Sequence, residues 1–576
     1  MTSETNLTKA PTVQTSRVNL HFSVLIGMGL LLSVPCLIYG FPFYGDDSLS
    51  HAILYSQFAK QFWSGELYPR WLQELNAGLG DPTGYYYPPL SYWLTSLSRP
   101  LFPEDPNGWY QLGVSATVAV LFSGLTVYCW LIRTVDTSSA LLASIVYLIW
   151  PYHLHTDLYG RGALAELWAF VWMPLILWMV EAVIRQRQLA VVGLACAYGA
   201  LVLTHLPTTV VFSPVPIAYV LFFAPAEKRV SVISSTIISL LLGAGLAAIY
   251  LLPAMFMQEF IFHTTEGISG HYYFGNWFLF TGLTWTGRHS EFFMVSLAGI
   301  LLAGLAFALA RRSVTSNLQK TAWFWFVLAV GCFTMMMPLS KPVWDLLPGL
   351  QKIQFPFRFN TVLSVAAVSL VAFAYFRKPR LARLILISLL ALFGTISLYA
   401  TAVRAYYAYP VHHYDEPVNE TAQKRLALKR VTNEFRPRWV TSVDEQPLDD
   451  LLTRIGMVQG ELNRVRVVKG EASVAIDKWT PREIRLRVQS SEGTELNVSQ
   501  FYFPGWTVKV DDAEARAAAP SKPGGLLQIS VPAGNHQVLL QLRQRGPEFA
   551  GKIISGVSLI VLLALVAVSV RRRRRP

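Results

Sequence analysis

The chain has 576 residues, of which 53% are hydrophobic, 13% are aromatic and only 14% are charged. This balance excludes an ordinary soluble protein and predicts a polytopic membrane protein. The formal net charge is +13, but no nucleic-acid-binding motif accompanies it, so we expect no nucleic-acid partner. Basic residues instead gather in short loops and in the five arginines of the C-terminal tail, a placement typical of membrane orientation.

Windows of about 20 mostly apolar residues, the length needed to cross a bilayer, identify about twelve candidate transmembrane helices. No small-residue cleavage site follows the first of them, so we expect a retained helix rather than a signal peptide. The four cysteines fall inside apolar runs without metal-ligand spacing, which predicts neither a disulfide nor a zinc site. The candidate helices begin near Leu20, Leu112, Ser139, Leu164, Leu189, Pro207, Ser231, Phe292, Thr321, Phe359, Leu381 and Ile553.

The loops between these helices alternate in their content of lysine and arginine. With the N-terminus in the cytoplasm, the basic loops all fall inside, as the positive-inside rule requires. An even number of helices then places both termini in the cytoplasm. The inside basic residues are Arg133, Arg185, Arg187, Lys228, Arg229, Arg311, Arg312, Lys320, Arg377, Lys378, Arg380, Arg383 and the arginine tail.

This topology divides the chain into four parts. Residues 1–19 form a cytoplasmic tail, and residues 20–403 form a transmembrane domain with a long first outer loop, 41–110. Residues 404–549 form an extracytoplasmic, mostly β domain, and residues 550–576 contain the last transmembrane helix and a basic cytoplasmic tail. The expected fold class is therefore a polytopic α-helical membrane protein with a β-sandwich-like domain before its last helix.

Local patterns within the two largest outer segments support this division. In the first outer loop, HAILYSQFAKQFWSG has apolar residues at helical spacing and predicts a helix along the membrane interface. The outer domain begins with a charged stretch, 419–435, that predicts a helix. Its later segments 484–488, 506–510 and 538–542 alternate between apolar and polar residues and are separated by Pro-Gly and Gly-Gly turns, which predicts a small β-sandwich.

The unusual polar residues gather at the outer ends of the helices and in the outer loops, while the helix centres are nearly free of charge. An ion-coupled transporter would be expected to place charges near the membrane midplane. One-sided clustering instead favours chemistry, or recognition of an amphiphile, at the outer leaflet. The clustered residues are Asp46, Asp47, His51, Arg70, Asp81, His153, His155, Asp157, Arg161, Glu166, His205, Gln258, Glu259, His263, Lys352 and Arg358.

Each of these residues also has a simpler structural interpretation. Asp46 or Asp47 could cap the helix expected to start near Ser48, although no capping box follows either residue. His51 lies four residues after Asp47, on the same helical face, and could be an ordinary interfacial side chain.

The same applies to the later motifs. Arg161 and Arg358 could be interfacial anchors. His205, directly before Leu206 and Pro207, could mark a helix boundary. The aromatic run YYYPPL at 85–90 could belong to an aromatic belt at the membrane surface. The residues alone leave these alternatives open.

The overall arrangement resembles the GT-C superfamily of membrane glycosyltransferases. The shared features are an acidic pair after the first helix, amphipathic helices in a long first outer loop, many further helices and an outer soluble domain. Several segments are more closely similar to bacterial YfhO-like proteins and to "6-pyruvoyl-tetrahydropterin synthase-related" membrane proteins. They are YGDDSLSH, the run 68–71 followed by YYYPPL, LYGRGALAE, THLP, LLPAMFMQE, LPGLQKIQFPFRF, FYFPGWTVKVD and VPAGNHQVLLQL.

The resemblance implies an inverting glycosyltransferase of the cytoplasmic membrane whose active site faces outward. It would move a sugar from a polyprenyl-phosphate-linked donor to an extracytoplasmic glycan, lipid or protein acceptor. The alternative is a non-catalytic transport or assembly protein that handles lipid-linked glycans. No cofactor is expected, although a divalent metal on the carboxylates stays open.

The resemblance also suggests roles for individual residues. Asp46 or Asp47 would accept the proton of the attacking hydroxyl, with Asp46 slightly favoured because it lies nearest the exit of the first helix. Cationic side chains would hold the departing phosphate. The candidates for binding the donor and acceptor are His51, Arg70, Tyr86, His153, Arg161, Glu166, His205, Glu259, Lys352 and Arg358.

Overall fold

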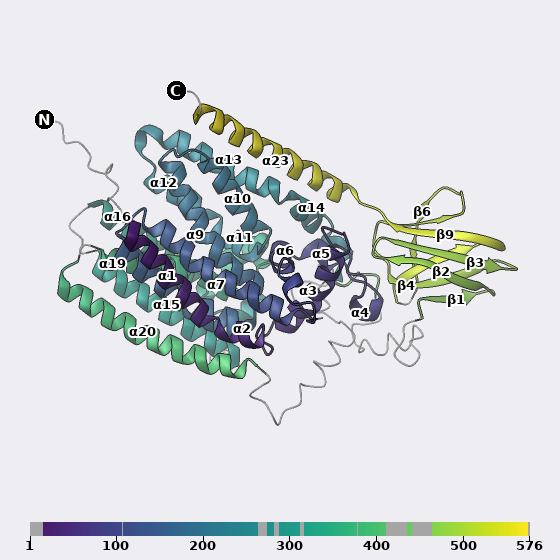
Figure 1. Cartoon of the computed structure of the whole chain (residues 1–576), viewed down its shortest axis with the longest axis horizontal. Helices are drawn as coiled ribbons and strands as arrows, with labels where there is room; N and C mark the ends of the chain where they lie inside the picture. The colour runs from purple at the N-terminus through teal and green to yellow at the C-terminus, as the bar shows by residue number, and fades with distance from the viewer. Residues whose placement is uncertain are drawn as a thin grey trace.

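The computed structural model describes residues 15–105, 107–262, 273–281, 287–311, 316–376, 378–409, 435–440, 463–522 and 524–573. These residues form a bundle of helices and, beyond one end of the bundle, a β domain (Figure 1). A helical membrane-protein bundle followed by a β domain and a last helix was the expected architecture. Almost all of the predicted helix at 419–435 lies outside the described residues.

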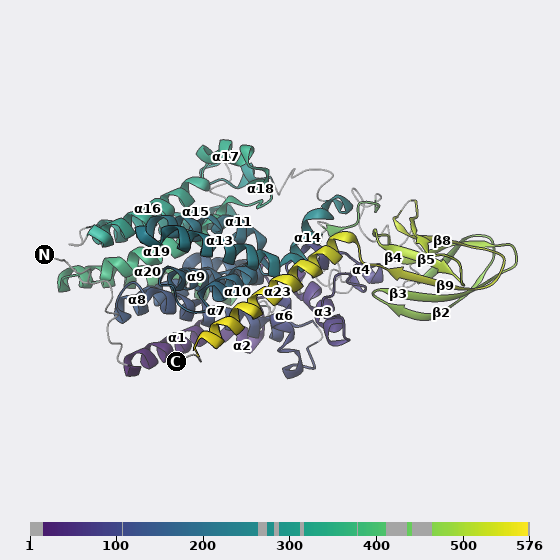
Figure 2. The same ribbon diagram turned by 90° about the horizontal axis from the view of Figure 1, so that it is seen from above.

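The bundle is built around α19, whose small and β-branched side chains are buried along the whole helix. Helices α8, α15 and α16 pack directly against it. In contrast, α20 and α23 lie on the periphery of the bundle and expose most of their apolar side chains, as lipid-facing helices do (Figures 1 and 2). The bundle helices are α1 (Thr15–Leu32), α2 (Val34–Tyr39), α7 (Trp109–Leu131), α8 (Thr137–Leu148), α9 (Leu164–Ile184), α10 (Ala190–Val202), α11 (Leu206–Phe212), α12 (Pro214–Phe223), α13 (Arg229–Leu246), α14 (Ala248–Phe256), α15 (Gly287–Ala310), α16 (Ser316–Met335), α19 (Asn360–Tyr375), α20 (Arg380–Tyr407) and α23 (Gly546–Arg573).

Eight helical segments of the described chain are long and apolar enough to cross a membrane, or nine if the bent pair Leu318–Met335 and Pro338–Leu346 forms one span. The predicted number of about twelve, counted in windows of about 20 residues, is therefore not confirmed. The helices expected near Leu20, Ser139 and Leu189 are present, but as the shorter α1, α8 and α10. A proline follows within a few residues of each of their ends, where it restricts the preceding backbone and removes a donor.

The first outer loop folds into four short helices that pack against the bundle. The predicted helix of this loop is present as α3 (Ser48–Trp63), and its apolar side chains are buried in the same core as the bundle helices. The other three are α4 (Leu75–Gly78), α5 (Thr83–Tyr86) and α6 (Leu90–Ser96). Further short elements are η1 (Arg99–Leu101), η2 (Tyr152–Arg161), η3 (Ala226–Lys228), η4 (Gln258–Phe260), η7 (Phe274–Trp277), η8 (Pro338–Ser340), α17 (Lys341–Leu346), α18 (Pro348–Gln351) and η9 (Pro356–Phe359).

The β domain consists of two antiparallel sheets that share one buried core, in agreement with the predicted sandwich. One sheet has the order β1-β4-β8-β7 and the other β2-β3-β9-β5-β6. The three predicted strand segments lie in β3, β5 and β9, which are neighbours in the second sheet. The strands are β1 (Val465–Lys469), β2 (Ser473–Thr480), β3 (Glu483–Ser490), β4 (Thr494–Phe501), β5 (Trp506–Val510), β6 (Arg516–Ala517), β7 (Ala519–Pro520), β8 (Leu526–Val531) and β9 (Gly534–Leu542).

The core of the β domain continues into the first outer loop through Trp71. This side chain is fully buried, and its Nε1 donates a hydrogen bond to Gln500 Oε1 at 2.9 Å. Its ring meets Trp506 edge-on, with the ring centroids 6.2 Å apart. The backbone N–H of Phe501 also donates to the carbonyl of Leu79 at 2.6 Å. The loop and the β domain are therefore one packed unit.

Replacing Trp71 by alanine should loosen this unit. Truncating a buried tryptophan leaves a cavity and costs about 3–5 kcal/mol. We expect Trp71→Ala to lower the unfolding temperature of the purified full chain in detergent and to speed proteolysis within the β domain. Trp63→Ala is the control, since Trp63 is 52% exposed. Equal effects of the two substitutions would contradict the shared core.

Candidate functional site

Two segments far apart in the sequence, the acidic motif and residues 157–166, meet around the guanidinium of Arg161. Its Nη1 contacts Asp157 Oδ1 at 2.8 Å and Glu166 Oε2 at 2.6 Å, and its Nη2 lies 3.4 Å from Asp47 Oδ2. The carbonyl of Arg161 also accepts the backbone N–H of Asp47 at 2.7 Å. Asp47 follows the first helices, Arg161 ends η2 and Glu166 begins α9. One side chain therefore joins the acidic motif to the LYGRGALAE motif.

The local backbone explains why these segments approach so closely. Residues 152–161 form a π-helical turn, an irregular geometry that is frequent at functional sites. The turn ends at Gly162, whose φ of +63° favours glycine. A Cβ on Gly162 would overlap the hydroxyl of Ser48, and a Cβ on Gly45 would press on the Arg161 carbonyl. Both glycines are therefore required where the acidic motif meets η2.

Asp47 stands at the first position before α3, but its side chain makes no capping hydrogen bond. The simpler interpretation of this residue, a helix cap, is therefore wrong. Its carboxylate instead lies beside Arg161 and is 47% exposed. A carboxylate that is open to solvent on one side and fixed by a cation on the other is accessible to a ligand.

The carboxyl groups behind Arg161 are fully enclosed. Asp157 has 0% of its surface exposed and Glu166 has 1%, so their charges depend on the guanidinium between them. Burial, reinforced by the neighbouring Glu166 carboxylate, raises the pKa of Asp157 well above its usual value, against the opposing effect of Arg161. Oδ2 of Asp157 has no hydrogen-bond partner among the described residues. Asp157 therefore retains a proton more readily than an exposed aspartate.

Arg358 brings a second guanidinium to the same group. Its Nε lies 3.9 Å from Glu166 Oε2, and its Nη1 donates to the carbonyl of Ile353 at 2.9 Å. Nε has no hydrogen-bond partner within the described part of the chain. The neighbouring Phe357 ring lies 5.4 Å from the Arg161 guanidinium carbon. Two cations with only part of their donor capacity used thus flank one buried carboxylate.

Two neutral histidines complete the group. His205 interacts electrostatically with Glu166, Arg358, Arg161 and His51, and burial lowers its pKa to about 3. Burial, with a smaller contribution from Arg161, likewise lowers the pKa of His51 to about 3. Both rings are therefore uncharged at neutral pH and act as polar groups rather than as cations.

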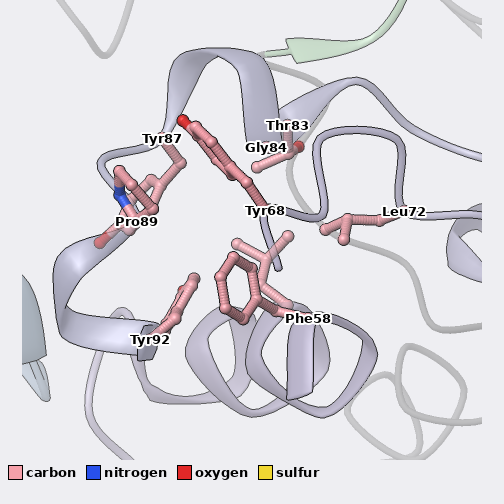
Figure 3. A pocket seen from close by; sticks show the side chains of 9 residues that line it. Phe58, Tyr68, Leu72, Thr83, Gly84, Tyr87, Pro89 and Tyr92 are labelled. Carbon is pink, nitrogen blue, oxygen red and sulfur yellow. The ribbon is translucent and has the colours of Figure 1, made fainter. Parts of the chain in front are cut away.

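His51 also faces the aromatic side chains of the first outer loop. Its Nδ1 lies 2.9 Å from the Tyr92 hydroxyl, and its ring packs edge-on against Tyr87. Tyr87, Tyr92, Tyr68 and Phe58 line a narrow apolar cavity on the other side (Figure 3). The cavity has room for about one water molecule. It is too small to hold a sugar.

Asp46, the other acidic residue of the motif, belongs to a separate ion-pair group. Its Oδ1 accepts from Arg288 Nη2 at 2.8 Å, and Arg288 Nη1 donates to Glu291 Oε2 at 2.8 Å. Arg288 and Arg404 both donate to the carbonyl of Gly160, at 2.7 and 3.2 Å. The two adjacent aspartates therefore contact different cations on either side of η2.

Arg70 and Tyr86, two further candidates, lie away from Arg161. Arg70 is 2% exposed, and its Nη1 pairs with Glu548 at 3.5 Å, at the start of α23. Its Nη2 donates to the carbonyl of Ile249 at 2.8 Å. The hydroxyl of Tyr86 donates to the carbonyl of Met257 at 2.7 Å. Both contacts join the first outer loop to neighbouring helices.

The remaining three candidates are also outside the Arg161 group. The ring of His153 is fully buried between Tyr147 and Phe170. Glu259 and Lys352 are exposed, and Lys352 Nζ donates to Gln258 Oε1 at 2.7 Å. Of the residues proposed from sequence, the structure brings together Asp47, His51, Arg161, Glu166, His205 and Arg358.

Sequence reasoning did not propose site roles for Asp157 or Arg288. Asp157 lies four residues before Arg161, and this helical spacing is a signal that could have identified it. No local signal links Arg288 to Asp46, because the two residues are 242 positions apart. Nor does any group of three or more His, Cys, Asp or Glu residues in the described chain converge as metal ligands do. Asp47 and Asp46 each contact an arginine, Arg161 and Arg288 respectively.

Residues 85–407 match the family model of the 6-pyruvoyl-tetrahydropterin synthase related domain, a membrane protein. The chain belongs to this family. This membership confirms the relationship expected from LYGRGALAE, THLP and LPGLQKIQFPFRF, which all lie within the matched residues. No curated protein matches the chain.

Solved structures similar to the chain include those of AftD and ArnT. A mutant of arabinofuranosyltransferase AftD from Mycobacteria is 15% identical with a TM-score of 0.46, over 70% of this chain and 28% of that chain. ArnT from Cupriavidus metallidurans, bound to undecaprenyl phosphate, is 15% identical with a TM-score of 0.40, over 72% of this chain and 70% of that chain. The chain thus spans less than half of the length of the AftD structures that it matches.

The raised pKa of Asp157 makes stability depend on pH. The native protein holds this proton to a higher pH than the unfolded chain, in which an aspartate has a pKa of about 3.9. Stability from this group is therefore fully present below that value and is lost as pH rises toward the native pKa. An amide at this position could not ionise, so the unfolding temperature of Asp157→Asn relative to wild type should increase between pH 5 and pH 8. Parallel pH curves for the two proteins would contradict the assignment.

Proposed function

We propose that this family member is a GT-C-type glycosyltransferase of the cytoplasmic membrane. It would transfer a sugar from a polyprenyl-phosphate donor to an extracytoplasmic glycan, lipid or protein. The observation that carries the proposal is the group around Arg161. The accessible carboxylate of Asp47 lies beside this guanidinium, and a second guanidinium, that of Arg358, lies 3.9 Å from Glu166 with an Nε that has no partner among the described residues. Guanidinium holds phosphate oxygens well, and a carboxylate can accept a proton from an attacking hydroxyl.

The proposed reaction is a single inverting displacement. The acceptor hydroxyl oxygen forms a bond to the anomeric carbon of the donor, and the bond between that carbon and the phosphate oxygen breaks. Asp47 takes the proton of the hydroxyl. The lipid phosphate departs with the bonding electron pair, and Arg358 and Arg161 stabilise its charge. Glu166 acts through these arginines as a positioning residue, because it contacts both of them.

The contacts of the two aspartates favour Asp47 over Asp46 as the base. Asp47 is held by Arg161 through its backbone N–H and its side chain, so it shares the group that would bind the phosphate. Asp46 is paired with Arg288 at 2.8 Å, and Arg288 belongs to the other side of η2. In this account Asp46 positions the loop that carries Asp47.

Substitution of the two aspartates tests this assignment. Asp47→Asn should lower the rate of sugar transfer about 100- to 10,000-fold, the usual contribution of a general base. Asp46→Asn should have a smaller effect. The measurement is transfer from a prenyl-phosphoryl sugar by purified full-length protein, normalised to the amount folded. Full activity of Asp47→Asn would favour the alternative, a non-catalytic transport or assembly protein.

The proposed outward orientation has its own test. The first turn of α1 and the last turn of α23 lie at the end of the bundle away from the β domain (Figures 1 and 2). This placement supports two cytoplasmic termini and an extracytoplasmic β domain. A reporter fused after Arg575 should therefore report the cytoplasm, and one inserted at Gly524 should report the outside. The reverse result would overturn the orientation and the assignment of the acceptor.

A further inference from the structure

His205 is fixed to the backbone through only one of its ring nitrogens. It is the residue before α11, and its Nδ1 accepts the N–H of Thr208 at 3.4 Å and lies 2.8 Å from the Thr208 hydroxyl. An acceptor nitrogen carries no hydrogen. This capping contact favours the neutral tautomer that carries its single hydrogen on Nε2. Capping of α11 thus leaves the other nitrogen as a donor.

That donor has no use within the described chain. Nε2 makes no hydrogen bond among the described residues, while the His205 side chain keeps 9% of its surface exposed. Helix α11 packs against α9, α19 and η9, which carry or adjoin Glu166 and Arg358. The ring interacts electrostatically with these two residues and with Arg161. A donor that the fold leaves unpaired can bond a ligand without breaking an internal hydrogen bond.

The two kinds of donor at this site suit two kinds of oxygen. Arg161 and Arg358 are permanent cations and suit the charged oxygens of a phosphate. A neutral imidazole N–H suits a neutral hydroxyl oxygen and adds no charge to the site. A donor group that contains both a phosphate and hydroxyls would use both sets.

We propose that the Nε2–H of His205 donates a hydrogen bond to a hydroxyl of the transferred sugar, and that the site thereby selects a glycosylated lipid phosphate over the bare lipid phosphate. This inference rests on the proposed function and adds a specificity-determining residue to it. The lipid phosphate product has no sugar hydroxyl and cannot form this bond. It would therefore bind less tightly than the glycosylated donor and leave the site more readily.

The two amide substitutions of His205 separate its two nitrogens. In His205→Asn the short amide can accept the Thr208 N–H and cap α11, but it does not reach the position of Nε2. In His205→Gln the longer amide places a donor near the position of Nε2 but is a poor cap. A merely structural histidine would therefore tolerate asparagine better than glutamine for every property measured.

The experiment compares the binding of farnesyl phosphate with that of farnesyl-phosphoryl pentoses and hexoses to the purified full chain. We expect His205→Asn to keep an unfolding temperature near that of wild type and to bind farnesyl phosphate normally. It should lose about 3- to 10-fold in affinity for the preferred glycosylated probe, the worth of one neutral hydrogen bond. His205→Gln should show the reverse pattern, with lower stability and a retained preference for the sugar.

Other outcomes separate the inference from the function on which it rests. If wild type binds farnesyl phosphate but gains no affinity from any sugar, or if His205→Asn keeps the wild-type preference, the role of His205 is wrong and the proposed function stands. If wild type binds neither probe, or if the Arg358→Met variant binds both probes as tightly as wild type, the proposed function itself fails.

Discussion

The site depends on one buried guanidinium, that of Arg161. Three carboxyl groups converge on it, one from the acidic motif and two, both fully enclosed, from residues 157–166. Isolated carboxylates could not be buried at this depth, because the cost of removing each charge from water far exceeds the stability of a domain. Arg161 therefore fixes where Asp47, Asp157 and Glu166 lie, and it does so at the end of an irregular turn rather than in a regular helix.

The rest of the fold supports that arrangement in layers. Helix α19 and the η9 turn before it bring Arg358 to Glu166, and α11 brings His205 to the same place. The first outer loop covers the group through α3 and α6, with His51 held against Tyr92. The β domain is in turn packed on that loop through Trp71. A β domain far along the chain thus supports a loop that begins directly after the first helices.

Much of this could be predicted from sequence, and the limits have physical reasons. Strands such as β5 and β9 were predictable because alternation and turn residues are local signals. The motifs that carry Asp47, Arg161, His205 and Arg358 were grouped from the sequence because the basic loops predict that they share one side of the membrane, and the structure brings these residues together. Contacts such as Asp46 with Arg288, and Arg70 with Glu548, were not predictable, since they join residues hundreds of positions apart. For that reason Arg70 was predicted to bind the ligand, whereas in the structure it pairs with Glu548 of α23.

The central claim is that the Arg161 group binds a lipid phosphate that carries a sugar. Native mass spectrometry of the full chain purified from its membrane, as wild type and as Arg358→Met, tests this most directly. The account predicts a bound polyprenyl-phosphate sugar in the wild-type protein and its loss from the variant, with the fold retained. A wild-type protein without any bound prenyl phosphate, or a ligand whose occupancy is unchanged in Arg358→Met, would contradict it.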